Sequence, residues 1–168
     1  MSKKLRVGLV GGTGMVGQRF ALLLENHPWF EVAAVAASVR SAGKTYAEAV
    51  EGRWRMPCPL PAAMAGLTVT DAADVDALAG LDFVFCAVDL DKSETRTLEE
   101  RYARAEIPVV SNNSANRSVP DVPMVIPEIN PEHLAVIPAQ RRRLGTRRGF
   151  IAVKPNCSIQ AYTPALAA

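Results

Sequence analysis

The sequence has little of what stabilises secreted, metal-bound or membrane proteins. Its three cysteines, Cys58, Cys86 and Cys157, show no C-x-x-C spacing, which argues against a disulfide framework and against a structural zinc site. No apolar run is long enough to cross a membrane, and the first residues lack the apolar stretch and cleavage site of a signal peptide. We therefore expect a cytoplasmic protein with no metal site and no membrane contact.

An excess of charge of one sign is also absent. The 19 basic and 17 acidic residues give a formal net charge of +2, which is too small to predict a polyanionic partner. The one strong charge run, residues 141–148, lacks interleaved aromatic residues, so we interpret it as a solvated loop edge and expect no nucleic acid. The two histidines, His27 and His133, are expected in surface or capping positions rather than as an acid or base.

What is present is a globular composition with an α/β pattern. With 49% hydrophobic residues among 168, the chain can bury one core and is too short for a second full domain. Strand-like stretches alternate with helix-like ones, which predicts an open, doubly wound, mostly parallel α/β sheet. The predicted strands cover residues 5–10, 31–37, 67–70, 83–88, 108–111, 124–126 and 150–153.

Caps and prolines mark the helices between these strands. The first predicted helix follows the first strand and ends before Pro28, which cannot continue it. Asp91 and Glu94 have the form of a capping box, and Asn130 before Pro131 predicts another helix start. Residues 38–65 are expected to form a long irregular connection with one short helix, residues 74–79 a short helix, and residues 158–168 the start of an apolar helix interrupted by Pro164.

A glycine-rich turn follows the first predicted strand. Gly12, Gly14 and Gly17 have the G-x-G-x-x-G spacing and open a predicted helix. Glycine lets the backbone approach a pyrophosphate, which free N–H groups and the positive end of the helix then hold. The pattern predicts a dinucleotide site, and the alternative is a strand–helix turn without a ligand.

The end of the second predicted strand favours NADP over NAD. A NAD site usually offers an acidic residue there to the ribose, but this chain has Ser38, Arg40 and Ser41 and no carboxylate. Two hydroxyls and a guanidinium can donate hydrogen bonds to a 2′-phosphate, which a carboxylate would repel. The alternative is that Arg40 is a solvated loop residue.

Cys157 is the candidate nucleophile. It follows the last predicted strand and the pair Pro155-Asn156, at the start of the terminal helix, where the helix dipole stabilises a thiolate. The alternative is a small buried apolar residue, which is also how we interpret Cys58 and Cys86. A thiolate beside a redox nucleotide suggests aldehyde oxidation through a cysteine thioester, whose acyl group a second nucleophile then takes.

Five segments carry a family resemblance. They are Gly12-Thr-Gly-Met-Val-Gly17-Gln18, Ala37-Ser38-Val-Arg-Ser-Ala-Gly43-Lys44, Ser111-Asn-Asn-Ser-Ala-Asn-Arg117, Asp121-Val-Pro-Met-Val-Ile-Pro-Glu-Ile-Asn130 and Pro155-Asn-Cys-Ser158. In this order along nearly the whole chain, they resemble the aspartate-semialdehyde dehydrogenases of the archaeal and fungal branch. The resemblance implies a Rossmann-like NADP domain and the reversible conversion of aspartate 4-semialdehyde, phosphate and NADP into aspartyl phosphate and NADPH. That reaction lies on the pathway to lysine, threonine and methionine.

The resemblance also implies roles for individual residues. Cys157 matches the nucleophile and Asn156 the neighbour that shapes the acyl site. Arg117 matches an arginine that binds phosphate or the substrate's phosphoryl group, unless it forms a surface ion pair, and Asn112 and Asn113 match a polar stretch near the nicotinamide. The implied cofactor contacts are Gly12, Thr13, Gly14, Met15, Val16, Gly17, Ser38, Arg40 and Ser41.

The family continues well past its cysteine, into a domain that supplies the substrate-carboxylate arginine, a catalytic histidine and most of the dimer interface. We therefore expect residues 1–156 to form the NADP domain and residues 157–168 to begin a catalytic and dimerisation domain whose remainder is absent. The whole enzyme would be a homodimer or homotetramer, whereas this chain alone would bind nucleotide but turn over little substrate. The alternatives are a malonyl-CoA reductase, a non-catalytic NADP-binding module, and a nonfunctional truncated product.

Overall fold

The computed structural model describes residues 3–168. The chain falls into two compact units, one ending at Asp89 and the other beginning at Leu90, and each is described by itself. Within the described residues, no helix combines the length and the apolar character needed to cross a membrane.

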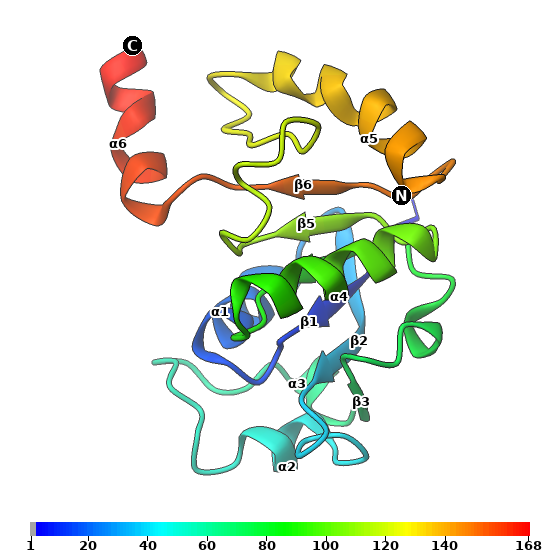
Figure 1. The fold of residues 1–168 in the computed structure, drawn as a ribbon. Helices are drawn as coiled ribbons and strands as arrows, with labels where there is room; N and C mark the ends of the chain where they lie inside the picture. Colours follow the sequence, from blue (N-terminus) through cyan, green and yellow to red (C-terminus); the bar gives the residue numbers. More distant parts are fainter. Residues whose placement is uncertain (1–2) are drawn as a thin grey trace. The chain divides into compact units, whose positions relative to one another are not determined.

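The first unit is built on four parallel strands. They pair in the order β3-β2-β1-β4, with the helix α1 connecting β1 to β2 (Figure 1). Helix α1 ends where predicted, because Asn26 adopts a φ of 54° and Pro28 follows. The elements are β1 (Leu5–Val10), α1 (Met15–Leu24), β2 (Phe30–Ala37), β3 (Val69–Asp71) and β4 (Phe83–Cys86).

The core of the first unit lies on both faces of β1 and β2. Val7, Leu9 and Val35 are almost completely buried, and these strands carry near-continuous apolar runs, as strands covered on both faces do. Phe20 of α1 stacks on Phe85 of β4, with 4.9 Å between ring centroids. This contact holds α1 against β4, the strand beside β1, and the glycine turn follows β1.

The connection between β2 and β3 is more regular than the sequence predicted. It contains two short helices, α2 (Tyr46–Val50) and α3 (Ala62–Ala65), instead of one. A capping box starts α2: the Thr45 side chain accepts from the Glu48 N–H, and the Thr45 N–H donates to the Glu48 carboxylate. The predicted helix at residues 74–79 is only the 3₁₀ turn η1 (Asp76–Leu78), and β3 and β4 are shifted or shortened by about two residues relative to the prediction.

The second unit contains one parallel strand pair and four helical segments. Strand β5 pairs with β6, and α4 begins at the predicted cap, where the Asp91 carboxylate accepts hydrogen bonds from the Ser93 and Glu94 N–H groups. The elements are α4 (Lys92–Arg104), β5 (Val109–Ser111), the 3₁₀ helix η2 (Pro131–Val136), α5 (Ile137–Leu144), β6 (Ile151–Val153) and α6 (Cys157–Ala167).

One prediction for this unit was wrong: residues 124–126 form no strand, because only Met124 pairs with Val153, in an isolated bridge. The helix start predicted at Asn130 and Pro131 is confirmed, since η2 begins at Pro131, but the Asn130 side chain does not cap it. Its Oδ1 accepts from the Ile126 N–H and its Nδ2 donates to the Met124 carbonyl. A side chain that folds the preceding segment back on itself cannot also cap the helix.

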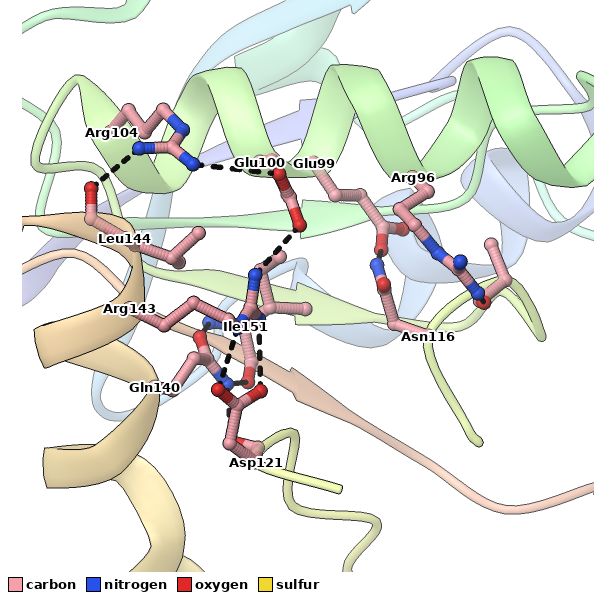
Figure 2. Close-up of polar contacts among 11 residues, drawn as sticks. Arg96, Glu99, Glu100, Arg104, Asn116, Asp121, Gln140, Arg143, Leu144 and Ile151 are labelled. Carbon is pink, nitrogen blue, oxygen red and sulfur yellow. Dashed lines mark hydrogen bonds and ion pairs between the residues drawn. The ribbon is translucent and has the colours of Figure 1, made fainter. Parts of the chain in front are cut away.

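The arginine run is also not simply a solvated loop edge. Residues 141–143 form the last turn of α5, where positive charge complements the helix dipole, and Gly145 ends the helix with a φ of 72°. Arg143 reaches between two carboxylates (Figure 2), with Nε 2.6 Å from Asp121 Oδ2 and Nη1 3.0 Å from Glu100 Oε1. Hydrogen bonding to Arg143 holds the pKa of the Asp121 carboxyl below its usual range.

Glu106 joins the end of α4 to the segment before β6. Its carboxylate accepts the backbone N–H groups of Arg147, Arg148 and Gly149 at 2.9, 2.6 and 2.8 Å. These bonds hold the pKa of Glu106 below its ordinary value of 4.5. Because the carboxylate is bonded in the folded state, its stabilising contribution is present above the unfolded pKa and is lost as the pH falls through the folded pKa.

Glu106→Gln is therefore expected to lower the free energy of unfolding at neutral pH and to flatten its decline between about pH 5 and pH 3. Urea unfolding at a series of pH values measures both effects. Glu25→Gln is the matched control, because the Glu25 carboxylate bonds to no group within residues 3–168. A Glu106→Gln variant that loses stability on acidification as steeply as the wild type would contradict the assigned role.

Candidate functional site

The glycine turn after β1 is packed too closely for side chains. Gly11 has a φ of 83°, and a Cβ there would overlap the Ala87 carbonyl, just beyond β4. A Cβ on Gly17 would overlap the Gly11 carbonyl. The turn thus lies at the carboxyl end of β1, next to the carboxyl end of β4. The strand order of the sheet reverses between these two strands, and open α/β sheets bind their ligands at such a point.

Gly14 differs from these two glycines because a Cβ at this position would not overlap any atom of the protein. A Cβ there would meet only the Gly11 carbonyl, at 3.5 Å, and the residue is exposed. Gly14 is also the N-cap of α1, and neither a capping side chain nor an acidic residue occupies the first turn. Met15 and Val16, which begin the helix, are exposed. An open, uncapped helix start fits a diphosphate group, which would meet N–H donors at the positive end of the helix dipole.

Two side chains that the sequence analysis did not single out for this role hold the turn from within the protein. The Tyr46 hydroxyl donates to the Gly12 carbonyl at 2.8 Å, and Gln18 Nε2 donates to the Thr13 carbonyl at 3.0 Å. Gln18 also bonds the backbone of Arg53 and Arg55, so its amide links the turn to the segment that follows α2. Both side chains are almost fully buried.

The residues predicted to bind a 2′-phosphate divide into two kinds. Ser38 and Arg40 are exposed just beyond the carboxyl end of β2. Ser41 is buried, and its N–H donates to the Ser38 carbonyl at 2.8 Å. The first two side chains are available to a ligand, whereas Ser41 shapes the turn that presents them.

In the second unit, Cys157 is the first residue of α6 and is exposed. The preceding Asn156 is the N-cap: its Oδ1 accepts from the Ser158 N–H at 2.9 Å and lies 3.9 Å from the Cys157 Sγ. Asn156 therefore fixes both the start of the helix and the surroundings of the thiol. Of the other cysteines, Cys86 is buried, as predicted, whereas Cys58 is exposed, so the interpretation of Cys58 as a buried apolar residue was wrong.

Arg117 connects the loop after β5 to the segment before Cys157. Its Nε donates to the Lys154 carbonyl at 3.0 Å, and its Nη2 to the Asn112 carbonyl at 3.3 Å. Lys154 is partly buried, and this burial, together with the charge of Arg117, lowers the pKa of its ammonium group, while the charge of Cys157 acts in the opposite direction. Two cationic side chains and the thiol are thus grouped at the end of β6.

A buried carboxylate that the sequence analysis missed organises the same loop. Glu99 on α4 accepts from Ser111 Oγ at 2.5 Å and from Asn113 Nδ2 at 3.1 Å. It also accepts from Asn116 Nδ2 at 2.7 Å (Figure 2). Asn113, predicted near the nicotinamide, therefore directs its amide to Glu99. The signal was visible in the sequence, since Glu99 falls on the apolar stripe of α4 beside Leu98 and Tyr102, where an unpaired carboxylate would be costly.

Comparison with known proteins identifies the family of the chain. A sequence model of the family described as semialdehyde dehydrogenase, NAD binding domain, matches residues 6–137. The aspartate-semialdehyde dehydrogenase of Methanothermobacter thermautotrophicus is 45% identical over 95% of this chain and 44% of its own length. That of Aspergillus fumigatus is 40% identical over 93% of this chain and 42% of its own length.

A solved structure supports the same relationship and confirms the predicted fold class. The aspartate-semialdehyde dehydrogenase of Candida albicans, crystallised with NADP, matches with a TM-score of 0.84 and 36% identity, over 98% of this chain and 46% of the other. The chain spans less than half the length of the curated relatives it matches. It corresponds to their amino-terminal portion, and it belongs to the semialdehyde dehydrogenase family, whose NAD-binding domain it contains.

Proposed function

We propose that this chain is the NADP-binding and nucleophile-carrying part of an aspartate-semialdehyde dehydrogenase. The reaction would be the reversible, phosphate-dependent oxidation of L-aspartate 4-semialdehyde to L-4-aspartyl phosphate, run in the reductive direction in biosynthesis. The observation that carries the proposal is the exposed Cys157 at the capped start of α6, beside Arg117 and Lys154, in a chain that also has an open dinucleotide turn. The archaeal and fungal relatives support the substrate.

The first unit would hold the cofactor. Its diphosphate would face the Thr13 N–H and the first turn of α1, and its 2′-phosphate would face Ser38 and Arg40, whose exposed side chains can donate hydrogen bonds. The NADP named for the Candida albicans enzyme supports this choice of cofactor. When bound, NADP supplies the hydride acceptor that aldehyde oxidation requires.

The second unit would carry the covalent chemistry. The Cys157 thiolate would attack the aldehyde carbon and form a C–S bond, and loss of hydride from that carbon to the cofactor would leave an acyl thioester on the sulfur. A phosphate oxygen would then attack the thioester carbonyl, and cleavage of the C–S bond would release aspartyl phosphate and the thiolate. Arg117, held in place by two backbone carbonyls, would bind the incoming phosphate with the remaining N–H groups of its guanidinium.

Cys157→Ser is expected to reduce NADPH formation by roughly a thousandfold or more in a full-length protein that carries this chain, because a serine hydroxyl is a far weaker nucleophile than a thiolate. The assay follows NADPH absorbance with aspartate semialdehyde, phosphate and NADP. NADP binding, measured by calorimetry, should stay nearly unchanged. Retained turnover, or loss of both activity and binding, would contradict the role given to Cys157.

Alkylation kinetics compare Cys157 with two internal controls. We expect iodoacetamide at neutral pH to modify Cys157 faster than Cys58, which is also exposed, because Cys157 begins a helix and lies near the cationic side chains of Arg117 and Lys154. The buried Cys86 should stay unmodified in the folded protein. Mass spectrometry of the digested protein over time gives the three rates, and equal rates at Cys157 and Cys58 would favour a structural cysteine and a non-catalytic NADP-binding module.

Phosphate recognition is tested by removing the two exposed side chains after β2. The double variant Ser38→Ala with Arg40→Ala should weaken NADP binding by about ten- to a hundredfold, because charge-assisted hydrogen bonds to the 2′-phosphate are lost. NAD binding should change little. Lys92→Ala, which removes an exposed positive charge from the other unit, is the control. An equal loss for NAD and NADP would defeat the assignment.

A further inference from the structure

The carbonyl groups of the glycine turn are all occupied by donors from the protein. The Gly14 N–H bonds the Gly11 carbonyl at 3.1 Å, and the Gln18 N–H bonds the Gly14 carbonyl at 2.9 Å. Between them, the Gly12 and Thr13 carbonyls are bonded by the side chains of Tyr46 and Gln18. A carbonyl oxygen facing an anion would repel it, so the bonding of all four oxygens within the protein matters for a site that receives a diphosphate.

The hydrogen bond from the Tyr46 hydroxyl to the Gly12 carbonyl sets the direction of the next N–H group, that of Thr13. In a trans peptide the C=O and the next N–H point in opposite directions, so a Gly12 carbonyl directed at the buried Tyr46 hydroxyl turns the Thr13 N–H away from the protein interior. The N–H groups of Gly11 and Gly12 are already bonded to the Ala36 carbonyl. No group within residues 3–168 accepts from the Thr13 N–H, which leaves this donor for a ligand.

Tyr46 is itself held rigidly. Its side chain is completely buried, its ring packs edge-on against Trp54, and its N–H donates to the Leu67 carbonyl at 2.8 Å. Burial raises the pKa of the phenol, so the hydroxyl stays protonated and can donate at neutral pH. The capping box of Thr45 and Glu48 fixes the start of the helix that carries it.

We propose that Tyr46 is a positioning residue of the dinucleotide site, whose hydroxyl sets the orientation of the Gly12–Thr13 peptide so that the Thr13 N–H faces the cofactor diphosphate. Gln18 supports the same arrangement at the next carbonyl. This inference rests on the proposed function, because it assigns a role toward a cofactor that the turn is proposed to bind. It concerns a residue that lies outside the glycine motif and that does not touch the ligand.

The test compares two ligands on the purified chain. Tyr46→Phe removes only the hydroxyl and is expected to weaken NADP binding about three- to tenfold, the effect of one misdirected hydrogen-bonding group. Adenosine 2′-monophosphate, which lacks the diphosphate, should bind the variant as it binds the wild type. Calorimetry gives both affinities, and circular dichroism confirms that the variant is folded. A merely structural role would weaken both ligands alike.

Two further variants complete the design. Tyr102→Phe removes the hydroxyl of a tyrosine equally buried in the other unit and should leave both affinities unchanged. If Tyr46→Phe fails to fold, the same two affinities are measured for Gln18→Met. A loss of affinity confined to NADP supports the positioning role, and an equal loss of affinity for both ligands overturns it. An unchanged NADP affinity in folded Tyr46→Phe also overturns it. Absence of NADP binding by the wild type overturns the proposed function together with this inference, so the two failures are distinguishable.

Discussion

The close approach of the glycine turn to the chain beyond β4 is the constraint on which the first unit depends. Gly11 can lie against the Ala87 carbonyl only because it has no side chain and adopts a positive φ. That contact starts α1 directly after β1, with Gly17 packed against the same turn. The result is a helix start whose first residues, Gly14 to Val16, are open toward solvent, while Gly11 and Gly17 are packed against the protein.

In the second unit a buried carboxyl group fixes the chain. The residues directly after β5 are mostly polar, and the Glu99 carboxylate accepts three hydrogen bonds from Ser111, Asn113 and Asn116. A buried carboxylate is costly unless it is fully bonded, so its polar partners are held as firmly as a packed core would hold them. The loop so fixed presents the Asn112 carbonyl to Arg117, and Arg117 in turn holds the backbone just before Cys157.

The sequence could predict features whose causes are local. The glycine spacing, the Asp91 cap and the helix end before Pro28 each depend on neighbours within a few residues, and the structure contains all three. It could not predict features whose partners are distant. The isolated bridge of Met124 depends on Val153, in a different part of the chain. Asn130 is a different case: its partners Met124 and Ile126 are near in the sequence, but the residue types do not show that its amide bonds backward instead of capping the helix that follows. Apolar composition alone predicted a strand there, although the partner segment offers one bridge only.

The connection between β2 and β3 shows why an aperiodic segment can be ordered and functional. A site for an anion must expose N–H groups, and each exposed N–H requires that the carbonyl of the same peptide be satisfied elsewhere. Three of the four residues of the turn are glycines, which close packing requires at Gly11 and Gly12, so the turn has few side chains that could do this. The side-chain donors come from outside the turn: Tyr46 lies in α2, and Gln18 is oriented by the backbone of Arg53 and Arg55. Because this connection contributes a few polar contacts and no continuous apolar face, hydrophobic periodicity does not reveal it.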